Sequence, residues 1–444
     1  MKSIKNTPLA LCALVSALAV SMQAHAGAQD EAKGFVEGAS LKMQNRLLYE
    51  RLNYQHGDTT RVVKGPRSDK AEEIGYGLML NFESGYTQGT VGFGVDAHAY
   101  GGLNLGADPD TVRSNPRYLA RDDDDLKDAF GRAGAVVKLR FSNTELKYGE
   151  MRTKNPIFHS SDTRLLPETN RGWLLSSNEI KSLSLQAGRF TQWADRNSRK
   201  NGGELLANYS GVNGNSFTFA GGNWTTPVAG LSLSGYYGRY EDVWNTAYLG
   251  GFYKMALADK QSLSFSLNLY RNTDTGKAKA GKVDNTTWSL MSTYAFGVHK
   301  LGLGYQKVDG DTPFDYVNRG SIWLENAMQI SDFNAPNEAS WQLKYDVDLG
   351  QMVTSGLTAG VAYTRGSDID YRRMNSVYTN FLGAPGSGGK HWERDMIVRY
   401  TVQEGKAKGL ALQLRYSAHR ANKAQGELSV DQIRLVAEMP LSIF

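Results

Sequence analysis

Residues 431–444, at the carboxyl end of the chain, read DQIRLVAEMPLSIF. Every odd position from Ile433 to Ile443 is apolar, while polar side chains such as Arg434 and Glu438 occupy even positions. Successive side chains of a β-strand point to opposite faces, so this segment has one face suited to lipid and one suited to water. Such alternation is typical of the strands of a bacterial outer-membrane β-barrel.

The amino end of the chain has the pattern of a secretory signal peptide. Two lysines precede an apolar stretch, residues 9–20, and residues 24–26 read AHA, a cleavage site of the A-x-A type. We expect residues 1–26 to be removed and residues 27–444 to form a single domain. The only cysteine, Cys12, lies in the removed segment, so the exported chain would contain no disulfide and no cysteine-ligated metal.

The composition narrows the class of protein. The 444-residue chain has 48 glycines, 23 tyrosines and only 11 prolines, and its formal net charge is +5. After residue 27 it has no apolar run near the ~18 residues that a membrane-spanning helix requires, which excludes a helical membrane protein but not a barrel. A net charge so close to neutral does not indicate nucleic-acid binding.

Segments in which apolar and polar residues alternate recur along the chain. Residues 76–83, 91–98 and 410–418 are examples, and each is typical of a β-strand with one apolar face. Short connections, such as residues 404–409, alternate with long polar ones, such as residues 154–178. A unit of strand, turn, strand and loop uses roughly 40–50 residues with strands of ~10 residues, which implies roughly sixteen to twenty strands. We therefore expect an all-β fold, a transmembrane antiparallel β-barrel with an aqueous lumen.

The alternation also assigns charged side chains to the lumen or to the lipid. Arg399 lies between Val398 and Tyr400, so it points away from the lipid that these two residues face. The same argument places seven basic side chains in the lumen: Arg46, Lys138, Arg140, Lys344, Arg399, Arg415 and Arg434. One interpretation is that any barrel lumen is polar and contains some arginine. The other is a positive track that lowers the electrostatic barrier to an anion.

Other candidate motifs are weak. Residues 383–390 read GAPGSGGK, but a phosphate-binding loop would need Ser or Thr where His391 stands. Residues 122–125 are acidic without the residue order of a calcium loop. The seven histidines show no metal-ligand spacing, and no nucleophile motif is present. We therefore expect no metal, no cofactor and no enzyme activity.

Several longer stretches resemble one family, the OprD-type porins or outer-membrane carboxylate channels. The resemblance extends from about residue 34 to residue 444. The most specific stretches are SGYTQGTVGFGVDA (84–97), VKLRFSNTELKYG (137–149) and SWQLKYD (340–346). Shorter matching stretches are residues 151–156, 162–167, 187–191, 310–316, 393–395 and 440–443.

The resemblance implies an eighteen-stranded barrel with a loop folded inward as a constriction, here residues 152–172. Candidate residues of that loop are Arg152, Asn155, Asp162 and Arg164. It also implies a ladder of inward basic residues that guides the carboxylate of a solute; Lys344 departs from the family, in which arginine is common at this position. Acidic residues, Asp311 or Asp315, would face an amino group of the solute.

These features predict a passive, substrate-selective channel in the outer membrane of a Gram-negative bacterium. The expected solutes are small carboxylates, with a preference for the benzoate or vanillate kind, because the basic ladder is strong and the constriction loop has no obvious acidic cluster. Alternatives are a channel for basic amino acids or small peptides, an enzyme on a barrel scaffold with His391 or His419 as base, and an adhesin. Expected partners are lipid and lipopolysaccharide, and the barrel-assembly machinery through the carboxyl-terminal strand. A monomer and a homotrimer both remain possible.

Overall fold

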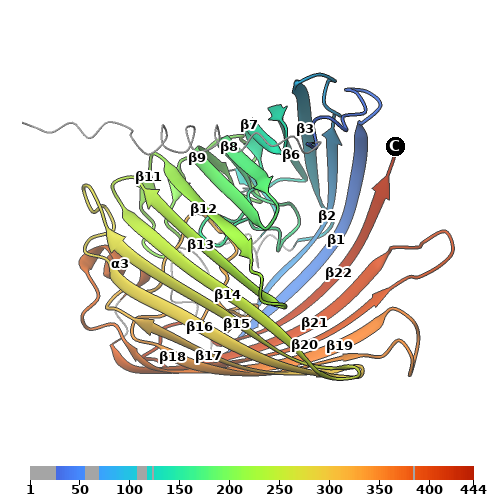
Figure 1. The fold of residues 1–444 in the computed structure, drawn as a ribbon. Helices are drawn as coiled ribbons and strands as arrows, with labels where there is room; N and C mark the ends of the chain where they lie inside the picture. The colour runs from blue at the N-terminus through green and yellow to red at the C-terminus, as the bar shows by residue number, and fades with distance from the viewer. Residues whose placement is uncertain (1–26, 56–69, 108–117, 123–124, 384–385) are drawn as a thin grey trace, which may run out of the picture.

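The computed structural model describes residues 27–55, 70–107, 118–122, 125–383 and 386–444. The predicted signal peptide lies outside these residues. The described chain forms one antiparallel sheet of eighteen strands that closes on itself, because β1 pairs with both β2 and β22. Figure 1 shows the closure, with the carboxyl-terminal strand β22 beside β1. The predicted barrel of about eighteen strands is confirmed.

The barrel strands, in chain order, are β1 (Ser40–Tyr54), β2 (Lys70–Glu83), β3 (Val91–Asn104), β6 (Ala129–Phe141), β7 (Thr144–Met151), β8 (Thr169–Ile180), β9 (Leu183–Ala194), β12 (Phe217–Thr225), β13 (Leu231–Tyr240), β14 (Trp244–Ala258), β15 (Gln261–Asp274), β16 (Asp284–Phe296), β17 (His299–Asp309), β18 (Ala339–Asp348), β19 (Leu357–Asp370), β20 (Ser387–Thr401), β21 (Ala411–Ala421) and β22 (Val430–Ser442). The connections contain β4 (Arg121–Asp122), β5 (Asp125–Leu126), β10 (Leu205–Leu206), β11 (Asn213–Gly214) and the helix α3 (Ser376–Leu382). Among the described residues, no helix is both long and apolar enough to cross a membrane.

The predicted alternation between lipid and lumen is visible strand by strand. On β17, Leu301 and Leu303 are exposed on the outside, whereas Gln306 is buried on the inside. The outer face is therefore apolar although solvent-exposed, as a lipid-facing surface is. Connections at one end of the barrel are short, such as residues 142–143, whereas long loops gather at the other end.

Two of the long loops fold inward and pack on the wall. In the first loop, residues 152–168, Leu165 is fully buried in a cluster with Leu48 of β1 and Tyr118. Phe158 of the same loop stacks on Phe217 of β12, with ring centroids 5.0 Å apart. The apolar core of this protein is therefore divided into clusters between inward loops and the wall.

The first inward loop is shorter than the sequence suggested. We expected it to extend to residue 172, but residues from Thr169 onward belong to β8. Their backbone pairs with the neighbouring strand, as in the Gly149–Gly172 and Glu150–Arg171 pairs. The second inward loop, residues 310–338, connects β17 to β18.

Candidate functional site

Four adjacent strands bring arginines to one part of the lumen wall. The strand order places β20 beside β21, β21 beside β22 and β22 beside β1. Across these pairings, Arg415 lies opposite Arg434, and Arg46 lies opposite Glu438. Closure of the barrel thus joins residues from the two ends of the chain. This was predicted from closure and from parity, the alternation of successive side chains between lipid and lumen.

These side chains border one cavity, which we call the arginine cavity. Its charged and amide side chains include Arg46, Asp162, Arg164, Gln329, Arg399, Arg415, Arg434 and Glu438. The cavity has an empty volume of about 680 Å³, which includes space open to the lumen. Five arginines against two carboxylates leave an excess of positive charge.

Two of the arginines are compensated by carboxylates. Arg46 pairs with Asp162 of the first inward loop and with Glu438 of β22, each at 2.7 Å. Arg434 pairs with Glu50 of β1 at 2.5 Å. Both arginines are nearly inaccessible to solvent. Because burying an unpaired charge is very unfavourable, these pairs hold the inward loop and the wall together rather than offer a free charge.

The other two arginines of this wall keep their charge available. Arg415 donates a hydrogen bond to the neutral side chain of Gln329, which reaches the cavity from the second inward loop. The Arg399 side chain is exposed to the lumen. Within the described part of the chain, no carboxylate lies within 4 Å of either guanidinium group. These two residues can therefore receive an anion.

The remaining predicted ladder residues lie elsewhere in the lumen. Lys138, near the short 142–143 turn, forms an ion pair with Asp96. Arg140 lies 3.9 Å above the ring of Tyr86 and donates a hydrogen bond to Gln29. The structure thus places the basic residues in separate groups instead of one continuous row.

Lys344 borders a second cavity, which we call the acidic cavity. Its polar side chains are Glu325, Gln329, Gln342, Lys344, Asp346, Asp395 and Arg415. The ammonium group of Lys344 lies 3.4 Å from Asp346. Gln329 and Arg415 border both cavities, so the acidic cavity adjoins the arginine cavity.

The predicted residues of the constriction loop have different roles. Arg152 pairs with Asp162 at 2.9 Å, so this aspartate bridges Arg152 and Arg46. Arg164 lines the arginine cavity. Asn155 is buried and accepts hydrogen bonds from the backbone of Phe158 and its neighbour, so it shapes the turn rather than meets a solute.

The two acidic residues proposed as partners of a solute do not lie in the arginine cavity. Asp315 is buried among the long loops, where it accepts hydrogen bonds from the backbone of Tyr209 and Ser210 and from the hydroxyl of Tyr378. Burial raises the pKa of Asp315 to about 6. Asp311 lies 3.4 Å from the exposed Arg373. Both carboxylates thus have partners in other loops, and their role toward a solute stays a prediction.

Sequence reasoning missed several residues that shape the cavities. Glu50 and Glu438 share the lumen parity of Arg46 and Arg434, so the same rule would have found them. Gln329 lies in a long loop without periodicity, and nothing in the sequence indicates that it reaches the arginines.

Comparisons with known proteins agree with this architecture. The family model described as outer membrane porin, OprD family, matches residues 33–443. Porin D of Pseudomonas aeruginosa is 40% identical over the whole of both chains. The porin-like protein GalP of Pseudomonas putida is 31% identical, over 93% of this chain and 94% of the relative.

Solved structures agree as well. The crystal structure of Pseudomonas aeruginosa OprD has a TM-score of 0.80 at 40% identity, covering 94% of this chain and 98% of that one. The structure of OpdK from the same organism, solved with vanillate, has a TM-score of 0.82 at 33% identity and covers 92% of this chain and 100% of that one. The chain belongs to the OprD family of outer membrane porins.

Proposed function

We propose that this porin admits small carboxylate-bearing solutes, and that Arg399 and Arg415 receive the carboxylate. The observation that carries the proposal is that, among the described residues, these two lumen arginines form no ion pair with a carboxylate within 4 Å, whereas Arg46 and Arg434 do. An arginine fork binds a carboxylate through two parallel hydrogen bonds, which favours this anion over a spherical one. The channel is passive, and it needs binding weak enough to release the solute.

The nature of the rest of the solute follows from the neighbouring cavity. Our preference for benzoate-type acids was based on the absence of an acidic cluster in the first inward loop. The acidic cavity supplies three carboxylates from other segments: Glu325, Asp346 and Asp395. This favours the alternative, a solute that has a carboxylate at one end and a cation at the other, such as a basic amino acid.

The enzyme alternative gains no support from the described residues. His391 and His419 are fully buried, and their ring nitrogens contact each other and the oxygens of Glu338 and Leu428. An enzyme of this class would need a nucleophile beside an accessible base.

The test is block of ion current through the purified protein in a planar bilayer. Arginine and agmatine form a matched pair, because agmatine lacks only the carboxylate. We expect arginine to block at concentrations at least tenfold lower than agmatine. Equal block by the two would contradict the role of Arg399 and Arg415. Benzoate against benzyl alcohol is the corresponding pair for aromatic acids, and stronger block by benzoate than by arginine would restore our first substrate preference.

A further inference from the structure

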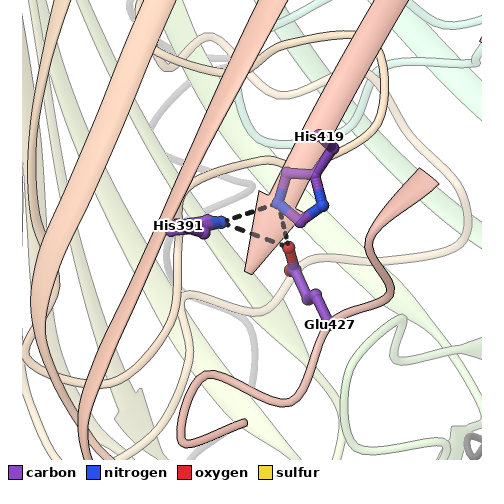
Figure 2. A group of neighbouring side chains, drawn as sticks. All are labelled: His391, His419 and Glu427. Atoms are coloured by element: carbon purple, nitrogen blue, oxygen red, sulfur yellow. Dashed lines mark hydrogen bonds and ion pairs between the residues drawn. The ribbon is translucent and has the colours of Figure 1, made fainter. Parts of the chain in front are cut away.

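Two histidines and a glutamate meet at the end of the barrel where the long loops gather. His391 lies near the start of β20, His419 near the end of β21, and Glu427 in the connection between β21 and β22. Figure 2 shows the three side chains pointing at one another. Nδ1 of His391 is 2.9 Å from Nε2 of His419, and a carboxylate oxygen of Glu427 is 3.4 Å from the first and 3.2 Å from the second.

The outer nitrogen of each ring, the one that points away from the centre of the group, already has a hydrogen-bond partner. Nε2 of His391 is 2.6 Å from a carboxylate oxygen of Glu338, and Nδ1 of His419 is 2.7 Å from the carbonyl oxygen of Leu428. The carbonyl oxygen can only accept, so Nδ1 of His419 carries a proton, and neutral His419 presents the lone pair of Nε2 to the centre of the group. Metal-binding histidines in proteins are oriented in this way, by a carboxylate or carbonyl behind the ring.

The spacing of the three inner atoms suits a transition-metal ion. Zinc binds imidazole nitrogen and carboxylate oxygen at about 2.0–2.2 Å, so two ligands of a tetrahedral ion lie roughly 3.3–3.5 Å apart. The three inner separations, 2.9, 3.2 and 3.4 Å, require only a small expansion to match. The inner oxygen of Glu427 is also inaccessible to solvent and lacks a hydrogen bond of good geometry, as a ligand waiting for a cation would.

We propose that His391, His419 and Glu427 form a binding site for one Zn²⁺ ion, with Glu338 as the outer partner that orients His391. The ion joins two wall strands to the connection at residues 422–429. It also lies beside the second inward loop, because Glu338 ends that loop and the ring of Phe333 stacks on His391 at 4.2 Å. The site therefore joins the 422–429 connection and the second inward loop to the rim of the barrel.

The competing explanation for the same contacts is a purely hydrogen-bonded group, in which a charged His391 lies between Glu338 and Glu427. Zinc binding distinguishes the two. The purified, metal-stripped protein in detergent is titrated with Zn²⁺, and Co²⁺ is added separately, because tetrahedral Co²⁺ has an intense visible absorption. We expect one Zn²⁺ per chain and a Co²⁺ band that excess Zn²⁺ removes.

The variants are Glu427→Gln and His419→Gln, with His299→Gln as the matched control. Glu427 lies in a connection, and glutamine keeps its size and polarity, so this variant is compatible with the fold. His299 lies near a short turn at the opposite end of the barrel, where its ring contacts Tyr345. We expect Zn²⁺ affinity to fall at least tenfold in the two site variants and to stay unchanged in the control.

Heat-modifiable mobility in gel electrophoresis, together with circular dichroism, shows which variants fold into the barrel. If His419→Gln does not fold, Glu427→Gln decides alone. The proposal is overturned if the metal-free wild-type protein binds no Zn²⁺ at micromolar concentrations. It is equally overturned if Glu427→Gln binds Zn²⁺ as tightly as the wild type and the His299→Gln control do, because the ion then binds elsewhere on the surface.

Discussion

Neutralising the two unpaired lumen arginines should change the ion selectivity of the channel. The variant is Arg399→Gln together with Arg415→Gln. Among the described residues, no carboxylate lies within 4 Å of the guanidinium group of Arg399 or Arg415, and Arg415 donates a hydrogen bond to the neutral Gln329, so the two glutamines break no ion pair. The barrel should therefore fold normally, and the reversal potential in a salt gradient should move toward cation preference.

The size of the change follows from the position of the charges in a water-filled lumen. At the dielectric constant of water, a unit charge about 6 Å from a passing ion contributes about 0.7 kcal/mol. Screening in 0.1 M salt lowers this to about 0.4 kcal/mol. Two charges act on anions and cations with opposite sign, so removing both changes the anion-to-cation permeability ratio by about 1.5 kcal/mol, or roughly tenfold.

A matched control lies on the same strand. Arg394 belongs to β20, as Arg399 does, but has the opposite parity and is exposed on the outer face. Arg394→Gln removes one charge without changing the lumen, so its reversal potential should equal that of the wild-type channel. The reasoning is refuted if the double variant keeps the wild-type permeability ratio, or if Arg394→Gln changes that ratio as much as the double variant does.

Three further variants probe carboxylates of the barrel wall and of the first inward loop. Glu50→Gln removes the partner of Arg434, so bilayer reversal potentials should move toward anion preference, opposite to the effect of the double variant; a move toward cations would contradict the pairing. Asp162→Asn removes the bridge between Arg46 and Arg152 and should destabilise docking of the first inward loop by about 1–3 kcal/mol, which single-channel recordings should show as larger and noisier conductance. Burial and then the charge of Asp195 raise the pKa of Glu168 to about 7, so the docked loop is favoured while Glu168 is protonated and loses this contribution as pH rises through about 7. Conductance noise should thus increase between pH 5 and pH 8 in the wild type, and Glu168→Gln should remove that dependence.

The wall of this protein was predictable from its sequence because the barrel imposes one simple rule. A strand in a membrane barrel must alternate between lipid and water, so the apolar residues beside Arg399, Arg415 and Arg434 determine which way the arginines point. Closure of the barrel then brings the first and last strands together, which places Arg46 with them. Neither step requires knowledge of side-chain contacts.

The ion-pair partners of these side chains and their depth in the lumen were not predictable, because both depend on strand register and on the loops. Parity does not reveal that Lys138 is paired with Asp96, or that Asp315 is enclosed by loop backbone. The histidine group shows the same limit. His391 and His419 are separated along the chain and follow no ligand spacing, but β20 and β21 pair so that His419 lies opposite Glu393, two residues from His391. Only the register brings the two rings together.

Under the proposed function, the selectivity of this lumen depends as much on the carboxylates as on the arginines. A row of seven free cations would hold a carboxylate so strongly that it could not leave, whereas conduction requires weak binding at several sites. In the structure, Asp162, Glu438 and Glu50 compensate Arg46 and Arg434, so the proposed carboxylate binding is limited to Arg399 and Arg415. These carboxylates also hold the inward loop against the wall. Under the proposed function, the contacts that hold the loop in the lumen are therefore the same contacts that keep carboxylate binding weak enough for release.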